Sequence, residues 1–128
     1  MARVLVVEDT EDICMTLATL CEMWGHAVEA AMSGREALAS VADFEPDVVL
    51  LDLTLPTESE GLEVARRIRV AAGAGVYIIA LAGWMTPAGR ARALIAGANM
   101  FLTKPPELDS LKRTIERVAR RTKRRRST

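Results

Sequence analysis

The sequence lacks any long hydrophobic run. Its longest nearly apolar stretch, Val76–Met85, contains Gly83 and has only about half the length that a membrane-spanning helix requires. The short apolar run at the N-terminus is interrupted by Glu8 and Asp9, whereas a signal peptide needs a longer apolar core. These absences argue against a membrane anchor and an export signal, and they predict a cytoplasmic protein.

Cysteine and histidine are also scarce. The two cysteines, Cys14 and Cys21, lie seven residues apart in a helical pattern, and we expect free thiols in a reducing compartment. The single histidine, His26, has no second histidine or carboxylate at metal-ligand spacing. We therefore interpret His26 as a structural residue.

Aromatic residues are absent from the strongly basic C-terminal end. Residues 112–128 carry nine basic residues and one acid, whereas the preceding 111 residues carry sixteen acids and eight basic residues. A basic segment without interleaved aromatics is weak evidence for nucleic-acid binding, although it would attract phosphates electrostatically. We expect one domain over residues 1–121, followed by a basic tail or linker stub over residues 122–128.

Short apolar segments alternate with helical patterns along the chain. Residues 4–7, 26–31, 47–52, 76–82 and 100–103 read as strands. Helices are expected between them and after the last one, with apolar stripes such as Ile13, Leu17, Leu20 and Trp24, or Leu108, Leu111, Ile115 and Val118. Five strands alternating with five helices predict an α/β fold whose parallel sheet is covered on both faces.

Charged residues follow three of the predicted strands. Glu8 and Asp9 follow the first strand, Asp52 ends the third, and Lys104 follows the fifth. Parallel strands of such a sheet place their carboxyl ends at one edge, where ligands bind. Three nearby carboxylates repel one another unless a cation intervenes, and Mg²⁺ favours such oxygen ligands. A carboxylate beside the metal can then attack phosphorus while an ammonium neutralises the phosphoryl oxygens.

Their order and spacing resemble the receiver domain of bacterial two-component response regulators, the CheY-like family, up to about Arg121. Further matching elements are Pro56, Gly61, Gly97-Ala98 and the segment from Phe101 to Pro105. The resemblance implies a flavodoxin-like, doubly wound sheet of five parallel strands in the order 2-1-3-4-5, with five helices.

The resemblance also implies a role for each matching residue. Asp52 corresponds to the phosphoryl acceptor, and Lys104 to the lysine that contacts the phosphoryl group. Phe101 matches an aromatic that changes position on activation, and Pro105 matches a cis-proline. The expected Mg²⁺ ligands are Glu8, Asp9, Asp52 and the Thr54 carbonyl, and the amides of Thr54 and Gly83 are expected to bind phosphoryl oxygens.

The sequence departs from the family at two places. Ala82 stands where the family has threonine or serine, which removes a hydroxyl from the phosphoryl site and from its coupling to Phe101. Asp52 and Gly61 are nine positions apart instead of eight, so the extra residue lies within residues 57–60. Trp84, near the same rim, is hypothesised to screen the site from water. We expect phosphorylation to persist and switching to be weakened or rewired.

Three kinds of function remain open. The first is a phosphoacceptor module that receives its phosphoryl group from a histidine kinase or phosphotransfer protein. It would signal to a protein target or output domain through its last two helices and fifth strand, a surface that could also form a homodimer. The second is a phosphorylation-independent interaction domain, which Ala82 favours. An enzyme is disfavoured, because Thr54 stands where an aspartyl phosphatase would carry its general acid.

Overall fold

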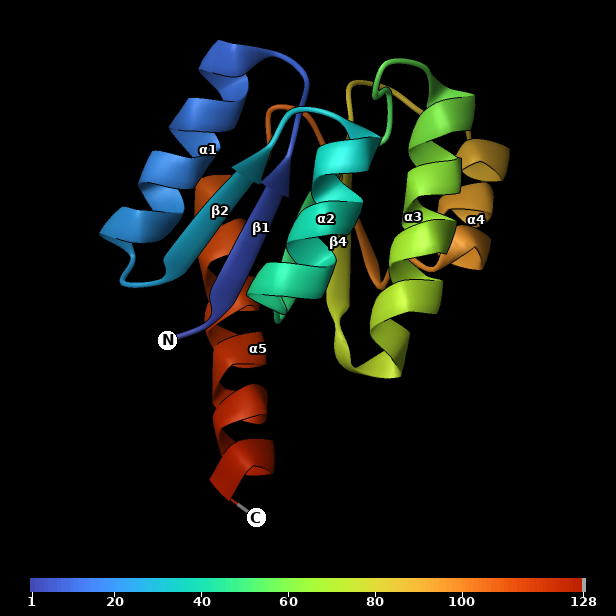
Figure 1. The fold of residues 1–128 in the computed structure, drawn as a ribbon. Coiled ribbons are helices and arrows are strands. Elements are labelled where there is room, and N and C mark those ends of the chain that lie inside the picture. The colour runs from blue at the N-terminus through green and yellow to red at the C-terminus, as the bar shows by residue number, and fades with distance from the viewer. Residues whose placement is uncertain (128) are drawn as a thin grey trace.

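The computed structural model describes the backbone of residues 1–127 and the side chains of residues 1–122. In this part of the chain, five strands alternate with five α-helices (Figure 1). The strands are β1 (Arg3–Val7), β2 (Ala27–Ala31), β3 (Val48–Asp52), β4 (Tyr77–Ala82) and β5 (Met100–Thr103). The helices are α1 (Glu11–Met23), α2 (Gly34–Phe44), α3 (Glu58–Ala72), α4 (Pro87–Ala96) and α5 (Leu108–Ser127), and a 3₁₀ turn, η1 (Gly73–Gly75), precedes β4.

The five strands form one parallel sheet in the order β2-β1-β3-β4-β5. This confirms the predicted α/β class and the strand order that the family resemblance implies. The chain passes from β1 outward to β2 and then returns to β3 on the other side of β1, so the strand order reverses there. The carboxyl ends of β1 and β3 are adjacent, with Val7 paired to Leu51, and a crevice at such a switch point is the expected ligand site.

Each face of the sheet has its own hydrophobic core. Helices α2, α3 and α4 pack on one face, and α1 and α5 pack on the other (Figure 1). Strand β3 lies between the two cores, and all five of its residues are buried. The burial of both faces explains why the four residues of β3 that precede Asp52 are all apolar.

Helix α1 buries a face that is rotated from the predicted stripe but shares Leu17 with it, and the partly buried Trp24 also packs against the core. Its buried residues are Cys14, Leu17, Ala18 and Cys21, whereas Ile13 is 39% exposed. The predicted stripe consists of larger side chains. The small cysteine and alanine side chains instead lie at the contact, where they let the helix approach the sheet closely. Both cysteines are free thiols, as predicted, and burial raises the pKa of Cys21 to about 12.

Helix α5 crosses the predicted domain boundary at residue 121 and continues to Ser127. Figure 1 shows its C-terminal part extending beyond the edge of the sheet opposite the carboxyl ends of the strands. Of the predicted basic tail, the side chains after Thr122 lie outside the described residues. Among the described residues, no helix is both long enough and apolar enough to cross a membrane.

The buried ring of His26 should make stability depend on pH. Its Nδ1 atom accepts a hydrogen bond from the amide of Ala2 at 3.0 Å, which requires an unprotonated Nδ1. Burial and the N-terminal ammonium lower the pKa of His26, although Glu116 acts in the opposite direction. Because the unfolded chain binds a proton near pH 6.5 and the folded chain resists it, the unfolding free energy should fall as the pH drops below about 6.5.

A comparison of urea unfolding between the wild-type protein and His26→Asn isolates this effect. The asparagine oxygen can replace Nδ1 as an acceptor, but the side chain does not titrate. Between pH 7.5 and 5.5 we expect the wild type to lose stability relative to the variant, by at most about 1.4 kcal/mol. A stability difference that is constant over this range would contradict the assignment.

Candidate functional site

The ends of four strands meet at one edge of the sheet. Glu8 follows β1, Asp52 ends β3, Ala82 ends β4 and Lys104 follows β5. The amide of Glu8 still donates to Ala31 in β2 at 3.0 Å, and the amide of Lys104 donates to the Ala82 carbonyl at 2.7 Å. The hydrogen bonds between the strands therefore extend to both residues and fix the positions of their Cα atoms.

Lys104 connects the two buried acids. Its Nζ atom lies 3.0 Å from Oε2 of Glu8 and 3.3 Å from Oδ2 of Asp52. Both carboxylates are almost fully buried, with Glu8 1% and Asp52 2% exposed. The structure thus brings Lys104 together with Asp52 and with Glu8, which is 96 residues away in sequence, and this is the convergence that the strand ends predict.

The pKa of Glu8 is raised and the pKa of Asp52 is lowered from their ordinary values. Burial raises the pKa of Glu8, and the hydrogen bonds from Lys104 and from the Thr10 amide offset only part of that increase. Burial alone would raise the pKa of Asp52 too, but the amide and hydroxyl of Thr54 donate to it and hold the pKa below its ordinary value. Asp52 is therefore the carboxylate that best keeps its charge. Although burial disfavours an ammonium, the two acids raise the pKa of Lys104.

The acidic residues fit a hard divalent cation. One carboxylate oxygen from each of Glu8, Asp9 and Asp52 lies within 4.8 Å of the others. Asp9 is exposed, while Glu8 and Asp52 are buried, so the group opens to solvent on one side. Carboxylate oxygens in such a half-open cluster suit Mg²⁺, which keeps several of its waters when bound. The Thr54 carbonyl stays a predicted further ligand.

The three residues at the expected phosphoryl site differ in character. Thr54 is exposed, and both its amide and its hydroxyl donate to Oδ1 of Asp52, at 3.0 and 2.9 Å. The family resemblance implies a role only for the backbone of Thr54, and nothing in the local sequence pattern indicates that its hydroxyl contacts Asp52. Ala82 is buried in the core on the α2–α4 face and has no polar side-chain atom. Gly83 is exposed at the start of the loop before α4.

Phe101 and its surroundings occupy the middle of β5. The ring is partly buried and packs against the core on the α2–α4 face, while the guanidinium of Arg90 from α4 lies 5.3 Å from its centroid. The bond between Lys104 and Pro105 is cis, as the resemblance implies. Trp84 is 80% exposed, so the structure gives no support to the hypothesis that its ring screens the site from water.

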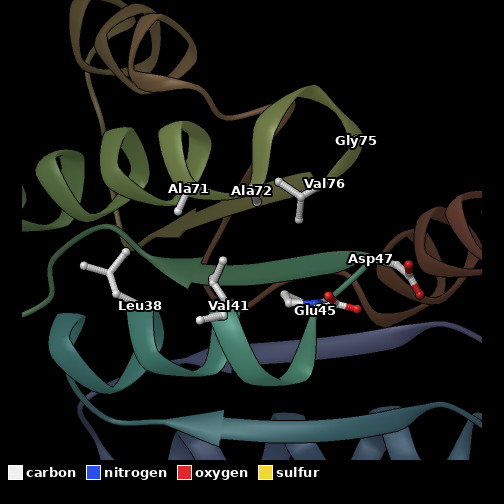
Figure 2. A pocket seen from close by; sticks show the side chains of 10 residues that line it. Leu38, Val41, Glu45, Asp47, Ala71, Ala72, Gly75 and Val76 are labelled. Carbon is white, nitrogen blue, oxygen red and sulfur yellow. The ribbon is translucent and has the colours of Figure 1, made fainter.

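Two of the hollows in the described part of the chain lie beside the sheet, and Lys104 lines one of them. A cavity of about 460 Å³ lies between the C-terminal parts of α2 and α3, beside Val41, Ala72 and Val76 (Figure 2). It includes Asp47, which precedes β3, so it lies at the opposite end of that strand from Asp52. A second groove, of about 580 Å³, is lined by α1 and by the β5–α5 loop and includes Lys104.

Comparisons with known proteins agree on one family. The sequence profile of the response regulator receiver domain matches residues 4–116. Response regulator MprA of Mycolicibacterium vanbaalenii is 37% identical over 120 residues, which cover 94% of this chain and 51% of that protein. MprA of Mycobacterium avium is 36% identical over 121 residues and is covered to 52%. The chain thus spans about half the length of these curated relatives.

Solved structures show the same similarity. The chemotaxis protein CheY4 of Vibrio cholerae superposes with a TM-score of 0.83 and 30% identity, over 92% of this chain and 98% of that one. NtrX of Brucella abortus, in a structure with ADP, superposes with a TM-score of 0.82 and 28% identity. That similarity covers 98% of this chain but only 28% of NtrX.

Proposed function

Because the chain belongs to the response regulator receiver domain family, we propose that it accepts a phosphoryl group on Asp52 from a histidine kinase or phosphotransfer protein. The observation that carries this proposal is the ammonium of Lys104, which lies 3.0 Å from Glu8 and 3.3 Å from Asp52 at the carboxyl ends of the strands. The acid pair, the third carboxylate of Asp9 and the lysine supply the groups that phosphoryl transfer to a carboxylate requires.

In the proposed step, a carboxylate oxygen of Asp52 attacks the phosphorus of the donor. A bond forms between this oxygen and phosphorus, and the bond from phosphorus to the donor nitrogen or oxygen breaks. The leaving group keeps the electron pair and takes up a proton. Lys104 stabilises the negative charge of the transferred group. Mg²⁺ held by Glu8, Asp9 and Asp52 would neutralise further charge on the phosphoryl oxygens.

We place the donor at the groove beside Lys104. Its walls include Ile13 and Leu20 of α1 together with Pro105 and Pro106 of the β5–α5 loop. A protein donor has to bring its phosphorylated side chain to the edge of the sheet, because Asp52 is only 2% exposed. An apolar surface next to the acceptor is a suitable place to bury part of that donor.

The output surface of the proposal is formed by α4, β5 and α5. Exposed apolar side chains lie on α4, where Ile95 is 82% and Leu94 51% exposed. Phe101 on β5 and Arg90 on α4 link this surface to the inner core. We propose that it contacts a target protein, an output domain or a second copy of the chain. Any enzymatic activity of the domain would be limited to its own phosphorylation and dephosphorylation.

Intact-mass measurement tests the acceptor assignment. With acetyl phosphate and Mg²⁺, the wild-type protein should gain the mass of one phosphoryl group. Asp52→Asn should gain none, because its amide nitrogen is not a nucleophile and the remaining acids are metal ligands or surface groups. Asp43→Asn, a change of the same kind at an exposed position of α2, should behave like the wild type. A folded Asp52→Asn protein that is still phosphorylated would contradict the assignment.

A phosphorylation-independent receiver is the second candidate, and Ala82 favours it because the end of β4 offers no side-chain hydroxyl. The same mass measurement separates the two functions. A wild-type protein that is folded and binds Mg²⁺ but gains no phosphoryl group would support an interaction domain.

A further inference from the structure

Helix α5 has a buried apolar side and an exposed basic side. Its buried residues pack in the core that α1 and α5 share, and they are Leu111, Ile115, Val118 and Ala119. The basic residues of α5 whose side chains the structure describes are all exposed, namely Lys112, Arg113, Arg117, Arg120 and Arg121. Among the described side chains, none of these five takes part in an ion pair. Their charges are therefore available to an anion from solution.

Three of the exposed arginines are spaced so that they lie on one side of the helix. Arg113, Arg117 and Arg121 follow one another at intervals of four residues, which places neighbours about 6 Å apart along the axis. The helix continues to Ser127, and residues 123–126 add four more basic residues. Because a guanidinium can donate two parallel hydrogen bonds to a phosphate, a row of arginines suits a polymer of phosphates.

The direction of α5 separates this positive charge from the acidic part of the molecule. Residues 112–128 carry nine basic residues and one acid, while the preceding 111 residues carry sixteen acids and eight basic residues. The C-terminal part of α5 extends beyond the edge of the sheet opposite the carboxyl ends of the strands (Figure 1). The cluster of Glu8, Asp9 and Asp52 lies at those carboxyl ends. A polyanion on the end of α5 would thus avoid the acids that repel it.

The composition of α5 favours duplex DNA over other polymers and surfaces that carry phosphates. Proteins bind single strands largely by stacking bases on aromatic rings, and residues 108–128 contain no aromatic residue. A helix that lies in a membrane surface needs an exposed apolar face. In the basic part of α5 the apolar residues Ile115, Val118 and Ala119 are buried, and residues 120–128 include no apolar residue. An α-helix fits the major groove of DNA, whereas that of duplex RNA is too deep and narrow.

We propose that the basic side of α5 binds the phosphates of double-stranded DNA without reading the base sequence. This inference goes beyond the proposed function, because it involves neither Asp52 nor a phosphoryl group. If about five of the nine basic residues contact phosphates, the logarithm of the dissociation constant should rise with the logarithm of the salt concentration with a slope of about 4.5. An increase from about 50 to about 200 mM salt should then weaken binding about 500-fold.

Fluorescence anisotropy of a short labelled DNA duplex tests the inference on the unphosphorylated full chain. In one triple variant, Arg113→Gln, Arg117→Gln and Arg121→Gln remove the row of charges and keep good helix formers in place. At about 50 mM salt this variant should bind the duplex about a hundredfold more weakly than the wild type, and its salt slope should be smaller by about 2.7. Urea unfolding should give the same midpoint for the variant and the wild type, because the three positions are exposed.

A second triple variant serves as the matched control. It removes the same amount of charge from exposed positions of α2 and α3 through Arg35→Gln, Arg66→Gln and Arg67→Gln. These arginines are not on α5, and salt screens exposed charges that lie far from the DNA, so the control should bind like the wild type. Asp52→Asn should also bind like the wild type, so a failure of phosphoryl transfer and a failure of DNA binding can be told apart.

Four results would overturn the inference. The first is a wild-type protein whose dissociation constant for the duplex exceeds about 100 µM at about 50 mM salt, weaker than ordinary non-specific binding. The second is an equal loss of affinity in the two triple variants. The third is tighter binding to a single strand of the same length. The fourth is tighter binding to vesicles of phosphatidylserine and phosphatidylcholine in equal parts, which would assign the basic side of α5 to a membrane surface.

Discussion

Gly61→Ala should destabilise the protein by about 3 kcal/mol or more, the upper end of what overpacking costs. A Cβ atom at position 61 would overlap the carbonyl oxygen and the carbonyl carbon of Leu53. Both are backbone atoms, so no side-chain rotation can relieve the overlap. Either α3 or the chain segment directly after Asp52 must move. Urea unfolding followed by circular dichroism measures the loss.

The control for this prediction is Gly89→Ala in α4. There the added Cβ would meet only the Met85 side chain and the Thr86 hydroxyl, each at 3.4 Å. A flexible methionine can adjust, and alanine is a better helix former than glycine by up to about 1 kcal/mol. We expect this variant to be as stable as the wild type or slightly more stable. A Gly61→Ala protein with wild-type stability would show that α3 does not pack on Leu53 as closely as described.

The position of Gly61 also shows what the sequence could predict about the region after Asp52. The nine-residue spacing from Asp52 to Gly61 indicates one extra residue, but not where the backbone accommodates it. In the structure α3 begins at Glu58, and the Thr57 hydroxyl accepts a hydrogen bond from the Glu60 amide at 3.3 Å. Residues expected to reshape a loop are thus partly helical. Whether these residues form a loop or the start of α3 depends on the packing of α3 against Leu53, which no local sequence pattern reveals.

The edge of the sheet could be predicted because it follows from periodicity alone. Strands that are apolar on both faces end at defined residues, and right-handed connections place their carboxyl ends together. This places Glu8, Asp52 and Lys104 at one edge of the sheet, and the strand order that the family resemblance implies brings them to one site. The types of the residues at the strand ends, together with that order, are enough for this prediction. The distance of 3.0 Å between Nζ of Lys104 and Oε2 of Glu8 is known only from the structure.

Interactions that depend on rotamers and loop paths could not be predicted in this way. Arg69 of α3 donates to the carbonyl oxygens of Gly73, Val76 and Gly97, and to the side-chain oxygen of Asn99. In the sequence, nothing distinguishes Arg69 from the other charged residues of α3. Its guanidinium meets these oxygens only because the ends of α3 and α4 come together in the folded chain. The hydroxyl of Thr54 is unpredictable for the same reason.

Lys104→Met should have a large effect on both stability and phosphorylation. The change keeps a long side chain but leaves Glu8 and Asp52 buried beside each other without their cation. Removing one partner of a buried ionic group costs about 3 kcal/mol, and because Lys104 is 21% exposed we expect about 2 kcal/mol at neutral pH without divalent ions. The phosphorylation rate with acetyl phosphate should fall about a hundredfold, as for the loss of one charge-stabilising group in other transfer sites.

Mg²⁺ should restore more stability to Lys104→Met than it adds to the wild type. In the wild type the ammonium already neutralises the acid pair, so a bound cation gains less there. In the variant the carboxylates of Glu8, Asp9 and Asp52 repel one another, and a divalent ion relieves this repulsion. Since a ligand stabilises the folded state according to its concentration relative to its dissociation constant, urea unfolding across a Mg²⁺ titration measures the difference. Lys112→Met, at an exposed position of α5, should respond to Mg²⁺ as the wild type does. Equal responses in all three proteins would mean that Lys104 and the cation do not share the same acids.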